Sequence, residues 1–164
     1  MQPQNPIAKQ PIREMVGATR APFFVGPGGT NVELEIHPPT GPAAADKRPG
    51  DGRTYLKFEN ITCEKRAPSL RVYLNLPPNE VPERHPELRA GSLGLFGIDD
   101  ASRPDGQHGG HGMTIQLDIT NLFRELSKNS RWNGHHLIIT FDPAQWDAPV
   151  PQVSISRVSM YLER

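Results

Sequence analysis

The sequence has one cysteine and no excess of charge of either sign, and each shortage excludes a class of protein. Because Cys63 is the single cysteine, no intrachain disulfide can form, and a small disulfide-stabilised scaffold is excluded. We expect a buried structural thiol there, and a thiolate activated by the neighbouring cations is the less favoured alternative. Lysine plus arginine and aspartate plus glutamate number 18 each, so the long-range field is weak. Nothing in this balance favours nucleic acid as a partner.

Long apolar runs are also missing. No stretch approaches the roughly 18 apolar residues of a membrane-spanning helix. The first ten residues, MQPQNPIAKQ, have neither the charged nor the apolar region of a signal peptide. The sequence therefore predicts a soluble, cytoplasmic protein with no membrane partner. Its 164 residues have room for one domain with one core.

Proline, in contrast, is abundant, and it is concentrated at the beginning of the chain. Residues 1–53 carry nine of the eighteen prolines and show no sustained helical or strand period. We predict an extended arm or linker that packs on the outside of the domain. It contains one strand at 30–36, where apolar and polar residues alternate.

Residues 54–164 show short strand-like runs that are separated by turn residues about every ten positions. Alternating apolar residues mark two of these runs: Leu70, Val72, Leu74 and Leu76 in one, and Met113, Ile115, Leu117 and Ile119 in the other. This spacing predicts an all-β fold, an antiparallel, jelly-roll-like β-sandwich of about six to eight strands. Apolar residues recur at helical spacing only near 119–128, where we predict one short helix that Asp118 or Thr120 caps.

The segment GQHGGHGM, residues 106–113, is the strongest candidate for a metal site. His108 and His111 supply imidazoles and Met113 a thioether, a combination that favours copper(I). Against this, ordering a glycine-rich segment around a metal costs backbone entropy. Met113 is also in phase with Ile115, which assigns it to the core face of the next strand. A mobile loop that faces a substrate or partner is therefore the preferred interpretation.

The remaining histidines do not suggest a shared site. His135 and His136 are neighbours at the start of a strand, so they point to opposite faces and one is expected to be exposed and the other packed. His85 precedes a proline and is expected to make a structural hydrogen bond.

The few aromatic residues allow two interpretations. Trp132 and Trp146 flank the strand-like run HHLIITF, and we expect each to close one end of the fold. The alternative is an exposed aromatic patch that includes Phe96 and binds a partner.

Several runs, in their order along the chain, resemble a known family. These runs are EMVGAT (14–19), NVELEI, YLKFENIT, LRVYLNLPP (70–78), HPELRAGSLGLFGIDDAS (85–102), IQLDITNLFREL (115–126), ITFDPAQW and VSISRVSMYLE. Over residues 14–163 the chain resembles the C-terminal domain that follows the catalytic domain of tyrosinases and polyphenol oxidases, the type-3 copper enzymes. In that family each of two copper ions is held by three histidines, mostly from a four-helix bundle of the catalytic domain, and this chain has no such bundle.

The resemblance implies a non-catalytic companion domain. In the family this domain covers the dicopper site and regulates access to it, and a side chain from one of its loops stands in for substrate. We therefore expect no catalytic residue and no bound cofactor in this chain, with copper in a catalytic domain that acts in cis or in trans. The expected shielding loop lies between Gly94 and Met113 and includes Phe96, His108 and His111.

Two other functions stay open at this point. One is a small copper-delivery partner, with His108, His111 and Met113 as the carriers. The other is a plain β-sandwich module for binding or for homo-oligomerisation through an exposed sheet edge.

Overall fold

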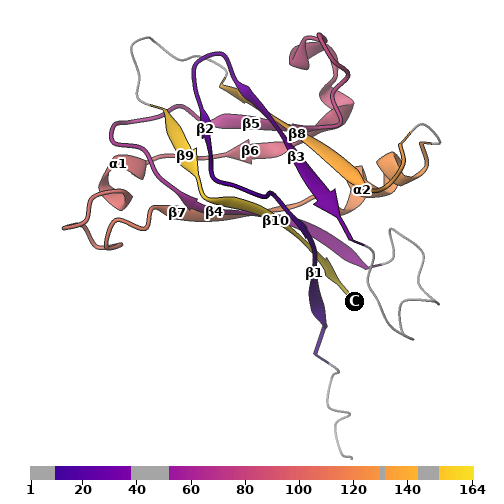
Figure 1. The fold of residues 1–164 in the computed structure, drawn as a ribbon, viewed down its shortest axis with the longest axis horizontal. Coiled ribbons are helices and arrows are strands. Elements are labelled where there is room, and N and C mark those ends of the chain that lie inside the picture. Colours follow the sequence, from indigo (N-terminus) through magenta and orange to yellow (C-terminus); the bar gives the residue numbers. More distant parts are fainter. Residues whose placement is uncertain (1–9, 38–51, 130–131, 144–151) are drawn as a thin grey trace, which may run out of the picture.

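The computed structural model describes residues 10–37, 52–129, 132–143 and 152–164, and most of them form antiparallel β-strands (Figure 1). The strands are β1 Arg13–Ala18, β2 Phe23–Val25, β3 Thr30–Ile36, β4 Arg53–Ile61, β5 Leu70–Leu74, β6 Arg89–Leu93, β7 Met113–Asp118, β8 His136–Pro143, β9 Val153–Ile155 and β10 Arg157–Glu163. Eight of them form one sheet in the order β6-β5-β8-β3-β1-β10-β4-β7, and β2 pairs with β9 in a separate ribbon. The predicted all-β, antiparallel class is confirmed.

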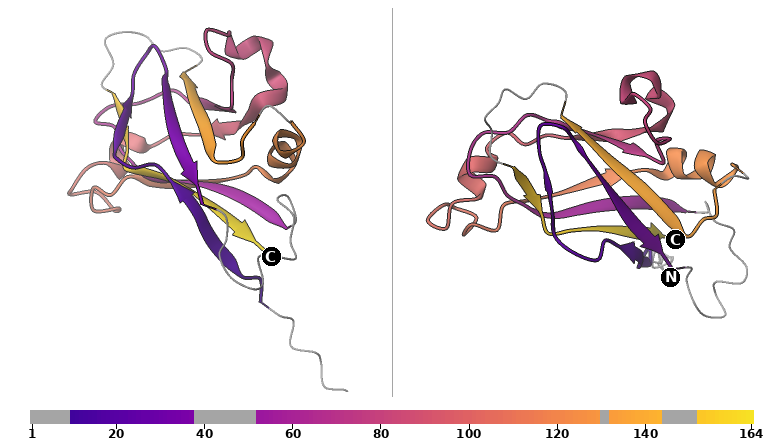
Figure 2. Two further views of the ribbon diagram at one scale, coloured as in Figure 1. Left: turned by 45° about the vertical axis from the view of Figure 1, so that its right-hand side comes forward. Right: turned by 45° about the horizontal axis from the view of Figure 1, so that its top comes forward.

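The large sheet rolls up until its two edge strands approach each other. At this seam Gly91 of β6 faces Leu117 of β7, and a Cβ on Gly91 would lie 3.2 Å from Leu117 Cδ2. Inside, the rings of Phe58 on β4 and Phe141 on β8 meet edge to face, with centroids 5.8 Å apart, although three strands separate β4 from β8 in the sheet. The two walls of the rolled sheet therefore enclose the core as the layers of a sandwich do, and their strands cross at an angle (Figure 2).

Two strands of the N-terminal third, β1 and β3, belong to the large sheet, whereas the sequence predicts an outer arm for residues 1–53. β3 lies between β8 and β1, and β1 lies between β3 and β10, so both are interior strands. Only the strand at 30–36 was predicted. In β1 the exposed residues precede the buried ones instead of alternating with them, and β2 has three residues, so neither shows a strand period. The rest of the predicted arm, residues 1–9 and 38–51, lies outside the described residues.

The core fills the space between the two walls. Fully buried side chains come from both, including Leu34, Leu56, Phe58, Leu74, Ile139, Phe141 and Met160. Each buried apolar side chain of this size contributes about 1.5–3 kcal/mol relative to its exposed state. Cys63 is buried in the same cluster, in agreement with the structural thiol predicted for it.

The predicted helix at 119–128 is confirmed as α2, Thr120–Ser127, and it covers one end of the core with Phe123 and Leu126. Asp118 Oδ1 accepts a hydrogen bond from the backbone amide of Thr120 at 2.9 Å. Trp132 packs edge-on against Phe123, with centroids 5.5 Å apart, as predicted for a ring that closes one end of the fold. The other tryptophan, at position 146, lies outside the described residues.

Three shorter helical segments carry no helical period in the sequence, because each is about one turn long. They are α1, Ile98–Ala101, and the 3-10 turns Pro82–Arg84 and Pro86–Leu88. Within the described ranges, none of the helices has the length and apolar character needed to cross a membrane.

Candidate functional site

The most unusual surface residue is Phe96, which lies in the connection 94–112 between β6 and β7, here called the Phe96 loop. Its side chain is 99% exposed, whereas Leu95 and Ile98 on either side are 1% and 0% exposed. A phenylalanine left in water forgoes about 2 kcal/mol of burial free energy. The buried neighbours therefore fix the backbone, while the ring of Phe96 stays in water.

The Phe96 loop is fixed to the sheet at its first half. Gly97 adopts a positive φ of 79° and reverses the chain directly after Phe96, and α1 follows. Ser102 Oγ then donates a hydrogen bond to the carbonyl of Ile98 at 2.6 Å and accepts one from the amide of Cys63 at 2.9 Å. Since Cys63 follows β4, these bonds tie the base of the loop to the wall of the barrel.

The second half of the loop folds back on the first. The amide of Gly112 donates to the carbonyl of Ala101 at 2.9 Å, and a Cβ on Gly112 would lie 1.9 Å from the carbonyl oxygen of Ile61. Between these points the glycine-rich segment forms successive turns, with His111 N donating to His108 O at 3.2 Å. The glycine-rich second half of the loop is thus a series of hydrogen-bonded turns.

The predicted metal ligands of this loop do not form a cluster. His108 and His111 are exposed on the turns, whereas Met113 is half-buried against the core, in phase with Ile115 and Leu117. Across the described ranges, no three or more His, Cys, Asp or Glu side chains are arranged to hold a metal ion. Met113 is therefore a core residue of β7, as the alternation predicted.

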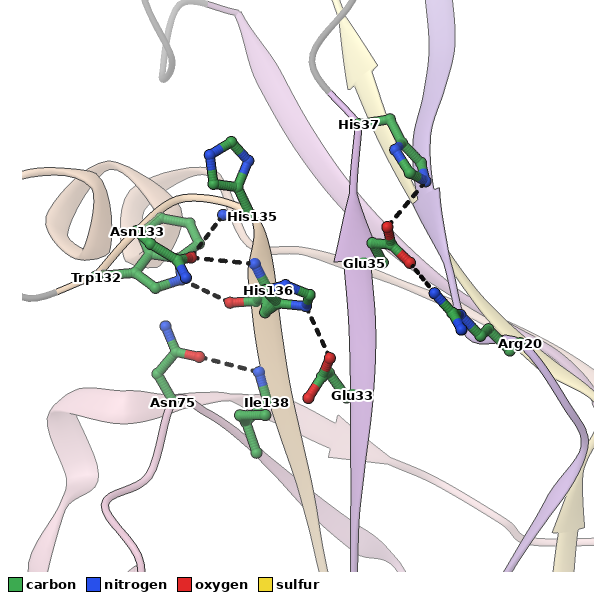
Figure 3. A network of polar contacts seen from close by, with 10 residues as sticks. All are labelled: Arg20, Glu33, Glu35, His37, Asn75, Trp132, Asn133, His135, His136 and Ile138. Atoms are coloured by element: carbon green, nitrogen blue, oxygen red, sulfur yellow. Dashed lines mark hydrogen bonds and ion pairs between the residues drawn. The ribbon is translucent and has the colours of Figure 1, made fainter.

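Three further histidines lie at one end of the β3–β8 pair, and two of them face carboxylates (Figure 3). His136 Nδ1 is 2.7 Å from Glu33 Oε1, and His37 Nε2 is 3.9 Å from Glu35 Oε1. Arg20 donates to Glu35 at 2.6 Å, and this hydrogen bond lowers the pKa of the Glu35 carboxyl. These side chains form separate ion pairs on the outer face of the sheet.

His135 and His136 are both exposed, so the prediction that one of them is packed is wrong. β8 begins only at His136, and the preceding residue lies in a turn. There Asn133 Oδ1 accepts the amides of His135 at 2.8 Å and His136 at 3.4 Å, and Trp132 Nε1 donates to the carbonyl of His136 at 2.7 Å (Figure 3). The two imidazoles are therefore surface groups and share no site.

All six histidines lie in the described ranges, and their arrangement does not fit a type-3 copper centre. Such a centre needs three imidazoles directed at each metal from a rigid frame. Here the imidazoles point outward from separate turns and strand ends, without a convergent set of three. No chemical step through copper is assigned to these residues.

His85 makes the structural hydrogen bonds that the sequence predicts for it. Its Nδ1 lies 3.0 Å from Glu87 Oε1, and its Nε2 lies 3.2 Å from Glu80 Oε2. The hydrogen bonds to Glu80 and Glu87 raise the pKa of the imidazole above its ordinary value. The imidazole therefore connects Glu80 with Glu87 within the turn segment between β5 and β6.

This pairing predicts a pH dependence of stability. A group whose pKa is raised on folding stabilises the fold below its unfolded pKa, about 6.5 for histidine, and loses this effect as pH rises through the folded value. We expect His85→Gln to lower the thermal midpoint at mildly acidic pH and to change it little in alkaline solution. Thermal unfolding over a pH series measures this difference. An NMR titration midpoint for His85 at or below 6.5, or a pH-independent difference, contradicts the prediction.

Most of the chain is similar to known proteins. A family model described as Domain of unknown function (DUF7868) matches residues 12–163. Tyrosinase HcTyr1 of Hahella sp. (strain CCB-MM4) is 27% identical over 156 residues, which are 93% of this chain and 33% of that tyrosinase. The chain thus spans about one third of the length of this curated relative.

Two solved structures match most of the chain. Latent aurone synthase (polyphenol oxidase) has a TM-score of 0.51 and 11% identity over 86% of this chain and 26% of its own. Latent apple tyrosinase has a TM-score of 0.46 and 16% identity over 93% of this chain and 27% of its own. The predicted resemblance to a domain of the tyrosinase and polyphenol oxidase family is confirmed, since the chain matches only a part of a tyrosinase. The chain belongs to the family described as Domain of unknown function (DUF7868).

Proposed function

We propose that this chain is a non-catalytic companion domain of a tyrosinase-like copper oxidase. It docks on the catalytic domain with the Phe96 loop and restricts access to the dicopper site there. The partner domain is proposed in cis, because the matched tyrosinase carries the similar region within a chain about three times as long. The same docking through the Phe96 loop applies in trans, when the catalytic domain is a separate chain.

The exposure of Phe96 is the observation that carries this proposal. Its ring is held outward at 99% exposure by buried neighbours, so docking requires little ordering of the loop. Burying the ring in a partner recovers about 2 kcal/mol. A benzene ring also has the shape of a phenol, so a pocket that accepts phenolic rings accepts this side chain. His108 and His111, exposed on the same loop, extend the proposed contact.

The test is to mix the chain with its cognate catalytic domain and to measure diphenol oxidation. We expect saturable inhibition that raises the apparent KM for the diphenol more than it lowers kcat. Phe96→Ala removes the ring that is proposed to be buried in the complex, and we expect at least a tenfold weaker inhibition, about 1.4 kcal/mol or more.

The matched control is Phe24→Ala, which removes an exposed phenylalanine from β2 instead of from the Phe96 loop. It should inhibit like the unmodified chain. Binding without any change in rate overturns the shielding role, and equal inhibition by Phe96→Ala and the unmodified chain overturns the role of this ring.

A further inference from the structure

A pocket with a volume of about 640 Å³ lies on the outer face of the sheet, over β8 and the start of β3. In β8, Ile138, Thr140 and Asp142 alternate with side chains that fill the core, so they point outward and line the pocket. One rim comes from the segment 76–82 after β5, and the other comes from residues 28–31, where β3 begins. The volume is within the roughly 300–1,000 Å³ of small-molecule sites.

Both rims are held by hydrogen bonds. At the base of the first rim, Asn75 Oδ1 accepts the amide of Ile138 at 3.0 Å, and the amide of Asn75 donates to the carbonyl of Ile138 at 2.8 Å (Figure 3). At the second rim, Thr30 Oγ1 donates to the carbonyl of Phe24 at 3.0 Å. The pocket therefore exists before a ligand binds, and binding requires little ordering of the chain.

Thr140 provides the observation that points to a ligand. The residue is 9% exposed and lines the pocket, and within the described ranges its hydroxyl makes no hydrogen bond. A hydroxyl that is largely withdrawn from water is unfavourable without a partner. The carboxamides of Asn31 and Asn79, on opposite rims, also make no hydrogen bond to this part of the chain. One hydroxyl and two amides thus offer both donors and acceptors around the same cavity.

The charged side chains of the lining are already paired. Asp142 Oδ2 accepts a hydrogen bond from Arg71 at 2.5 Å, and Glu80 Oε2 lies 3.2 Å from His85 Nε2. Among the described residues that line the pocket there is no lysine, arginine or histidine. An anion therefore meets no positive group there, and the two paired carboxylates do not require a cation. The lining favours a neutral ligand.

The rest of the first rim is aliphatic. Its side chains are those of Leu76, Pro77, Pro78 and Pro82. They present C–H surface to the pocket, opposite the hydroxyl and amide groups of β3 and β8. A ligand that fits both sides has an aliphatic face and several hydrogen-bonding groups at its edge.

We propose that this pocket binds a neutral ligand of the saccharide class. A sugar ring carries several hydroxyl groups that both donate and accept, which matches the hydroxyl of Thr140 and the amides of Asn31 and Asn79. The C–H face of the ring packs against the prolines, and the second oxygens of Asp142 and Glu80 accept from further hydroxyls. This site is independent of the docking proposed above, because no residue of the Phe96 loop lines it.

The test titrates the isolated full chain with D-glucose, D-galactose and D-mannose in turn and follows the backbone amides by two-dimensional NMR. We expect at least one of the three sugars to cause saturable shifts at millimolar concentrations, centred on residues 31, 79 and 140. Thr140→Val keeps the shape of the side chain and removes its hydroxyl, and it should weaken binding about fivefold or more. Asn79→Gly removes a carboxamide where the φ of 63° suits glycine, and it should weaken binding about threefold or more.

Thr114→Val is the matched control, because Thr114 is an exposed threonine of β7 that does not line the pocket. It should bind sugar like the unmodified chain, and the dispersion of the spectra verifies that every variant is folded. The site is overturned when none of the three sugars causes saturable shifts, or when Thr114→Val weakens binding as much as Thr140→Val. Catechol is a neutral aromatic ring with two hydroxyl groups, and its binding as tightly as the sugar overturns the assignment to saccharides.

Discussion

Phe141→Ala is expected to lower the free energy of unfolding by about 3–5 kcal/mol. Phe141 is 0% exposed, and its ring lies between the two walls of the barrel. Its centroid is 5.8 Å from that of Phe58 on β4 and 5.4 Å from that of Phe23 on β2. Truncation to alanine removes both aromatic contacts and leaves a cavity that rigid strands on either side cannot close. Losses of this size are a large fraction of the stability of a single domain.

Chemical denaturation of the two proteins measures this effect. The control is Phe24→Ala, which removes the same atoms from a side chain that is 59% exposed. It is expected to change the unfolding free energy by no more than about 1 kcal/mol. A similar loss in both variants would show that Phe141 does not connect the two walls.

The part of the fold that the sequence predicts is the part with local periodicity. Alternation in β7, where Met113, Ile115 and Leu117 face the core and the residues between them face solvent, identifies a strand with one buried face. The helical spacing of Phe123 and Leu126 identifies α2 for the same reason. In these elements the side chains that pack in the folded state are the ones that create the pattern.

The strands that the sequence does not reveal have no such pattern. β1 has a register irregularity between Met15 and Gly17 where it pairs with β10, so its exposed and buried residues do not alternate. Gly17 also packs against β3, and a Cβ there would lie 2.6 Å from the carbonyl of Glu35. Its place inside the sheet therefore depends on contacts with strands that are distant in the sequence. The closure of the sheet at Gly91 and Leu117 is long-range in the same way.

The candidate site shows the same division. The family resemblance, together with the glycine-rich tip, predicts a shielding loop between Gly94 and Met113 that includes Phe96. It does not reveal that the loop is anchored. The anchor joins Ser102 to Cys63 across 39 positions, and no local pattern encodes such a contact.

The second large effect is expected for Gly112→Ala, because the second half of the Phe96 loop packs against Ile61 of β4 at Gly112. Its φ is 75°, a conformation that costs an alanine about 1–2 kcal/mol. A Cβ would also lie 1.9 Å from the carbonyl oxygen of Ile61, so the backbone has to move. We expect the free energy of unfolding to fall by about 3 kcal/mol or more. The hydrogen bond from the amide of residue 112 to the carbonyl of Ala101 is expected to break.

Gly109→Ala separates the two causes, since it is a glycine of the same loop with a similar φ of 60° but no close neighbour. The nearest atom to its added Cβ is a side-chain carbon of His111 at 3.6 Å. Gly109→Ala should lower the free energy of unfolding only by the cost of the left-handed backbone conformation, about 1 kcal/mol. Denaturation measures the loss of stability, and exchange of the amide of residue 112, the donor in the bond to the Ala101 carbonyl, measures the loss of that bond. If the contact at Gly112 positions Phe96, Gly112→Ala also weakens inhibition of the catalytic domain while Gly109→Ala does not. Equal behaviour of the two variants in both assays rules out this role of the Gly112 contact.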